Sequence, residues 1–176
     1  MTALLAGIAA VTVPLVLLAS LAGQLRSPAA LPSALRAHGV LPPALTGPVA
    51  AAVIAVEAVV GLAGAAALPL WLDGPMRAAC AAAAALLALY AIYAAHVSRT
   101  RHGVPCGCAG ARTPMTGWVA GRAAALSALA AAGAVHGLPA GSTASELFVT
   151  VTAGLGFAVI LWTLPHAMIE ERRTAG

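Results

Sequence analysis

Residues 49–72 read VAAAVIAVEAVVGLAGAAALPLWL and residues 76–97 read MRAACAAAAALLALYAIYAAHV, with only Asp73, Gly74 and Pro75 between them. Each run is long enough to cross a bilayer, which takes about 20 apolar residues in a helix. Because the connection is so short, the two spans are predicted to pack as an antiparallel hairpin. The stretch therefore indicates an all-α integral membrane protein.

Three further apolar runs complete a prediction of about five transmembrane helices in a single membrane domain covering residues 1–176, with spans at 2–25, 49–72, 76–97, 117–135 and 146–164. A proline-rich linker at 26–48 follows the first span, and its residues 31–40 fit a short amphipathic helix on the membrane surface. Glycine and alanine crowd every span and let helix backbones approach closely. We therefore expect a tight four-helix-bundle core.

The composition excludes several classes of protein. The chain is 61% hydrophobic and 8% charged, against about 25% charged residues in soluble domains. Its basic residues are all arginines, placed singly or in pairs at span ends, and nucleic-acid binding would need a clustered basic face. The first span lacks a positive leading segment, so we expect it to be retained; small residues at 19–23 leave cleavage as the alternative.

The loop at 99–116 carries the most reactive groups, in the heptapeptide VPCGCAG at residues 104–110. Cys106 and Cys108 can form a disulfide only in a small, strained ring, and strained disulfides are the labile and catalytic kind. Gly107 allows the torsions that such a ring needs. The pair predicts thiol–disulfide exchange, while a reduced structural pair or half of a metal site stays open. Because only His102 is close by, no metal is predicted.

Two charged residues fall inside spans, and intramembrane ionisable groups are functional candidates. Glu57 lies about nine residues into its span, or ~13 Å deep. Arg122 is its expected partner at a similar depth, so the pair is either structural or tunes the thiols or an electron acceptor. A protonated Glu57 bonded to backbone is the other structural alternative.

The remaining titratable groups give weaker signals. Arg101, His102 and Arg112 in the loop would increase the thiolate fraction of a neighbouring cysteine. Cys106, the cysteine closer in sequence to Arg101 and His102, is the predicted attacking thiol. Cys80 is expected at the far end of the bundle as a small buried apolar side chain, and the remaining loop histidines, His38, His136 and His166, suggest no shared site.

Five crossings place the linker, the Cys loop and the C-terminal tail on one face of the membrane. Seven arginines lie on that face against Arg77 on the other. The positive-inside tendency therefore predicts a cytoplasmic Cys pair.

Around Cys106 and Cys108 the sequence resembles the MauE family of methylamine-utilisation membrane proteins, which are grouped with DoxX-like membrane proteins. Glu57 in the second span, after a proline-rich linker, supports the resemblance; Ala109 departs from it, because family members usually have an aromatic residue there. The layout is also similar to the vitamin K epoxide reductase bundle. The resemblance implies a thioredoxin-like partner or an exported disulfide-containing protein, an extracytoplasmic Cys pair and a role in methylamine utilisation.

Three hypotheses follow for this cell-membrane protein. The first is thiol–disulfide exchange by Cys106 and Cys108, either as an oxidoreductase or as its accessory subunit, with a quinone as an acceptor that no sequence feature demands. The second is a scaffold or chaperone without enzymatic activity. The third is a small transporter that uses Glu57 and Arg122.

Overall fold

The computed structural model describes the backbone of residues 2–101, 103–107, 114–138 and 144–174, and the side chains of these residues except 2–3, 144 and 164–174. These residues form six α-helices, whose bounds are α1 Thr2–Arg26, α2 Ala30–His38, α3 Pro43–Ala67, α4 Asp73–Thr100, α5 Gly117–His136 and α6 Ala144–Thr174. All but α2 are long and apolar enough to cross a membrane. The expected all-α membrane protein with five spans is confirmed.

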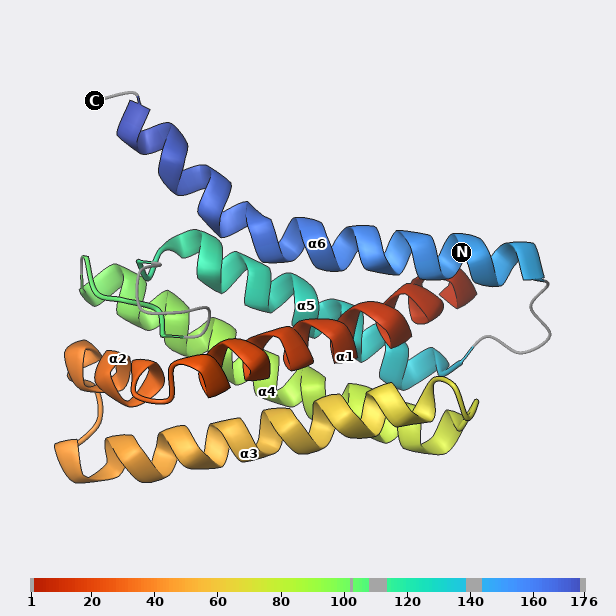
Figure 1. Cartoon of the computed structure of the whole chain (residues 1–176), viewed down its shortest axis with the longest axis horizontal. Helices are drawn as coiled ribbons and strands as arrows, with labels where there is room; N and C mark the ends of the chain where they lie inside the picture. Colours follow the sequence, from red (N-terminus) through yellow and green to blue (C-terminus); the bar gives the residue numbers. More distant parts are fainter. Residues whose placement is uncertain (1, 102, 108–113, 139–143, 175–176) are drawn as a thin grey trace.

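Helix α1 runs through the middle of the bundle, between α3 on one side and α5 and α6 on the other (Figure 1). Helix α4 packs chiefly on α5 and α3. The central core cluster joins side chains from all five spanning helices, among them Leu17, Val60, Leu87, Leu126 and Leu161. Burial of α1 on several sides explains why its apolar residues show no single hydrophobic face.

Small residues set the distance between these helices. A Cβ atom at Gly133 of α5 would lie 2.9 Å from Cys80 Sγ and 3.0 Å from Ala9 Cβ. At Gly64 of α3, it would lie 2.8 Å from Cγ of Pro14. Both glycines therefore stand where neighbouring helices come too close for a side chain.

The linker is more helical than the sequence suggests. Helix α2 occupies Ala30–His38, close to the expected surface helix, but α3 already begins at Pro43 and contains Pro48 in its second turn. Pro42 and Pro43 stand at the start of α3, where backbone N–H groups have no acceptor within the helix. Proline, which lacks the N–H, is therefore compatible with the start of a helix. The second span is therefore shifted toward the N-terminus, and it ends at Ala67.

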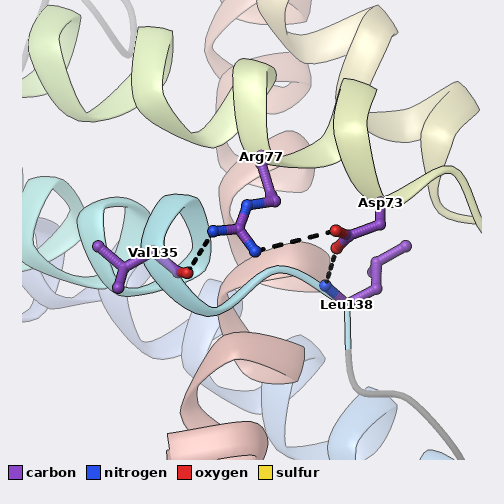
Figure 2. Close-up of polar contacts among 4 residues, drawn as sticks. All are labelled: Asp73, Arg77, Val135 and Leu138. Atoms are coloured by element: carbon purple, nitrogen blue, oxygen red, sulfur yellow. Dashed lines mark hydrogen bonds and ion pairs between the residues drawn. The ribbon is translucent and has the colours of Figure 1, made fainter.

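At the end of the bundle away from α2, a polar clamp joins α4 to the end of α5 (Figure 2). Asp73 accepts a hydrogen bond of 2.7 Å from the Leu138 amide, and Arg77 donates one of 2.6 Å to the Val135 carbonyl. The carboxylate of Asp73 lies 3.9 Å from the Arg77 guanidinium. The clamp satisfies backbone groups that the end of α5 leaves open.

Candidate functional site

The loop that carries Cys106 folds back on itself at the end of the bundle. Pro105 and Pro114 form an isolated antiparallel bridge, and the Met115 amide donates a 2.8 Å hydrogen bond to the Val104 carbonyl. Cys106 is only 3% exposed and packs in a cluster with Ala94, Val97, Met115 and Val119. Cys108, His102 and Arg112 lie outside the described residues, so the structure places one of the two predicted redox thiols.

At Gly107 the loop packs directly against α2. Its φ of +79° is a conformation that favours glycine. A Cβ atom there would lie 2.7 Å from Ala34 Cβ and 3.3 Å from Leu31 Cα. The glycine predicted to ease a disulfide ring thus also allows the loop to touch the surface helix.

His38 ties the same loop to α2 and α4. It ends α2, is 1% exposed, and its Nε2 lies 2.8 Å from the Pro105 carbonyl oxygen, one residue before Cys106. Because a carbonyl can only accept, Nε2 carries a proton, and in the neutral ring Nδ1 then accepts the bond of 2.8 Å from the Tyr93 hydroxyl. His38 has no role predicted from the sequence, but the structure buries it between α2 and the Cys loop.

Glu57 lies in α3 at 1% exposure and accepts three side-chain hydrogen bonds. Gln24 Nε2 and Ser20 Oγ of α1 lie 2.6 and 3.2 Å from its Oε2, and the Tyr90 hydroxyl of α4 lies 2.9 Å from its Oε1. The carboxyl group is therefore satisfied inside the apolar bundle by donors from two other spans.

Arg122 is not the partner of Glu57, contrary to the sequence-based expectation. Among the described side chains, its one recorded interaction is with Trp162 of α6, whose ring centroid lies 5.8 Å from the guanidinium carbon. Matching depth did not bring the two charges together because α3 packs on α1, α2 and α4, whereas α5 packs chiefly on α4 and α1.

A cavity of about 360 Å³ nevertheless connects these groups inside the bundle. Its wall includes Cys106, His38, Glu57, Arg122 and Trp162. The rest is mainly aliphatic, with Tyr90, Tyr93 and Ser20 adding hydroxyls. The chemistry available here is one thiol and several hydrogen-bonding groups facing an apolar space; the described residues contain no cluster able to hold a metal ion.

Sequence reasoning missed the groups that surround Glu57 and Cys106. The two tyrosines are the only ones in the chain and stand three residues apart on α4, so they share a helix face. Ser20 and Gln24 are four residues apart on α1, the same kind of signal. Polar residues at helical spacing in an apolar span would have predicted this network.

The chain matches the model of a protein family. The family model described as "Methylamine utilisation protein MauE" matches residues 1–136 of the 176. This range covers α1 to α5 and every described group of the site except Trp162. No curated protein and no solved structure matches the chain, so the resemblance to DoxX-like and vitamin K epoxide reductase bundles stays a prediction.

Proposed function

The chain belongs to the MauE family, and on this premise we propose that it is a multi-pass membrane protein that exchanges a disulfide between Cys106–Cys108 and a protein partner. The partner is a thioredoxin-like protein or an exported protein that needs disulfides, as the resemblance implies. The observation that carries the proposal is the fixed position of Cys106, which the His38–Pro105 bond and the Gly107 contact hold at the end of the bundle.

Because Cys106 is buried, the two thiols are expected to have different roles in disulfide exchange. A protein partner cannot reach a sulfur atom in a residue that is 3% exposed, so the sequence-based choice of Cys106 as attacking thiol is not supported. We assign contact with the partner to Cys108. Cys106 is the thiolate that leaves when a partner opens the disulfide, and it is the resolving thiol when reduced Cys108 attacks an oxidised partner. A partner thiolate then attacks Cys108 of the disulfide, Cys106 leaves as a thiolate, and a second partner thiolate breaks the mixed disulfide. The partner is oxidised and the Cys pair is reduced.

Trapping of the mixed disulfide tests this assignment. In the Cys106→Ser variant the Cys108 thiolate can still attack the disulfide of an oxidised partner, and a covalent complex should accumulate because Cys106 is no longer present to attack Cys108 and release the partner. The Cys108→Ser variant should accumulate little. The measurement is acid quenching of native membranes, alkylation with a maleimide polymer and non-reducing electrophoresis, with mass spectrometry of any shifted band.

Cys80→Ser is the matched control, because Cys80 is buried near the other end of the bundle beside Gly133. It should behave as the unaltered chain does. If no variant traps a partner, and Cys106→Ser/Cys108→Ser supports partner maturation as well as the unaltered chain, the chain is a scaffold. No described contact favours the transporter hypothesis, because Glu57 and Arg122 make separate interactions.

A further inference from the structure

The cavity has the size and surface of a small-molecule site. Its volume of about 360 Å³ lies within the range of roughly 300–1,000 Å³ for ligand pockets. Two lining residues, Leu89 and Val40, are 66% and 43% exposed. The cavity therefore reaches the outer surface of the bundle, and at Leu89, within the spanning helix α4, that surface faces lipid.

Arg122 supplies the cavity with a cation whose hydrogen-bonding capacity is not used by the described residues. Among the described side chains, its guanidinium interacts with the Trp162 ring alone. A guanidinium has five N–H donors. Arg122 is half-buried in the spanning helix α5, and a charged group there without acceptors among the described residues is costly. A ligand oxygen in the cavity would remove that cost, and the apolar wall would hold a ring or an isoprenoid chain.

We propose that this cavity binds a lipid-soluble quinone, with its ring among the aliphatic side chains and one carbonyl oxygen accepting hydrogen bonds from Arg122. The inference rests on the proposed function, since it names the compound that reoxidises the Cys pair. Cys106 lines the cavity, so this thiol of the reduced pair borders the quinone site.

The chemistry of the step balances. The two S–H bonds of Cys106 and Cys108 break and one S–S bond forms, which releases two electrons and two protons. A quinone accepts two electrons and two protons to become a quinol, whose hydroxyl oxygens carry the protons. A phospholipid acyl chain could enter the open cavity, but a phospholipid could not accept the electrons.

Binding is tested apart from thiol chemistry in the purified Cys106→Ser/Cys108→Ser protein. With Trp71→Phe and Trp118→Phe added, Trp162 is the only tryptophan and lines the cavity. Ubiquinone-1 should quench its fluorescence in a saturable manner, and equilibrium dialysis should give the same Kd. Arg122→Gln should weaken binding about tenfold through loss of a charged hydrogen bond, whereas Arg26→Gln, an exposed change outside the cavity, should leave the Kd unchanged.

A second pair of variants fills or spares the cavity. Ala123 lines it and is buried, while the neighbouring Ala124 is exposed on the same helix. Ala123→Leu should weaken binding at least tenfold and Ala124→Leu should not. Quenching that never saturates, or that is equal in these two variants, would show quinone dissolved in the micelle alone and overturn the proposal.

The redox step is measured with the reduced, otherwise unaltered protein and ubiquinone-1 without oxygen. One quinol should form for each Cys106–Cys108 disulfide, and Cys106→Ser/Cys108→Ser should form none. Saturable binding without any quinol would overturn the acceptor role. If the quinone oxidises the pair but no partner is trapped, the proposed function fails while the quinone site stands. If a partner is trapped but no quinone binds, the quinone site fails while the proposed function stands.

Discussion

At the scale of single residues, the site depends on polar groups that satisfy one another in apolar surroundings. Glu57 accepts from three donors on two other helices. His38 bridges Tyr93 and the Pro105 carbonyl. A buried polar group left without a partner costs about 1–3 kcal/mol, so these residues fix how helices α1 to α4 and the Cys loop meet.

Glu57→Gln should lower the free energy of unfolding by about 1–3 kcal/mol, because an amide presents an NH₂ group where the carboxyl accepted a hydrogen bond. Ser20→Ala removes the longest of the three bonds to Glu57, at 3.2 Å, together with a 3.3 Å bond from Gln24 Nε2. It should cost less, because the two shorter bonds to Glu57 remain. Denaturation in detergent, followed by circular dichroism, compares the two. Equal losses would mean that the three donors do not act on Glu57 as the distances indicate.

At the scale of elements, two pairs of glycines allow the effect of backbone conformation on a substitution to be measured apart from the effect of packing. Gly107 and Gly103 both have positive φ, +79° and +74°, but among the described residues a Cβ would meet another element only at Gly107. Gly133 and Gly121 both lie in α5, but only Gly133 faces close neighbours. One glycine of each pair is thus a matched control for the other.

Gly107→Ala should displace the loop from α2 and expose Cys106. In a background with Cys80→Ser and Cys108→Ser, the maleimide labelling rate of Cys106 should rise about tenfold, as expected when overpacking costs about 1–3 kcal/mol and opens a local structure. Gly103→Ala should change the rate much less, because a Cβ there meets no described residue within 4 Å. Ala34→Gly should restore slow labelling to Gly107→Ala in part, because it removes the 2.7 Å contact but leaves the 3.3 Å contact with Leu31 Cα. If it restores none, the contact with Ala34 is not what protects the thiol.

Gly133→Ala should destabilise the bundle by about 1–3 kcal/mol through the contacts with Cys80 and Ala9. Gly121→Ala should be neutral or stabilising by up to ~1 kcal/mol, since alanine has the higher helix propensity. Thermal unfolding in detergent measures both. Cys80→Ala should recover part of the loss in Gly133→Ala, and an equal loss in the two glycine variants would contradict the close packing of α4 and α5.

At the scale of the whole molecule, α2 and the Cys loop lie at one end of the bundle, and the Asp73–Leu138 clamp lies at the other (Figures 1 and 2). Five spans require the two ends to face opposite sides of the membrane. The arginine distribution predicts that the Cys-loop end is cytoplasmic, whereas an exported partner requires the other orientation.

Reporter fusions measure this arrangement directly. Alkaline phosphatase or a fluorescent protein is fused after Leu138 or after Thr174, and the two positions should report opposite sides. An active phosphatase after Thr174 places the Cys loop outside the cytoplasm, as an exported partner needs. Fluorescence there places it where the arginines predict. The same side at both positions would exclude five spans.

The sequence by itself determined the spans, their approximate ends, the Cys-Gly-Cys loop and the buried carboxylate, because these follow from local composition, helix length and the cost of charge in lipid. Only the tertiary structure decided which groups meet. Depth along a helix can be read from residue numbers, but rotation about its axis and the choice of neighbouring helix cannot. For that reason Glu57 pairs with Gln24, Ser20 and Tyr90 rather than Arg122, and His38 reaches the loop 67 residues further along the chain.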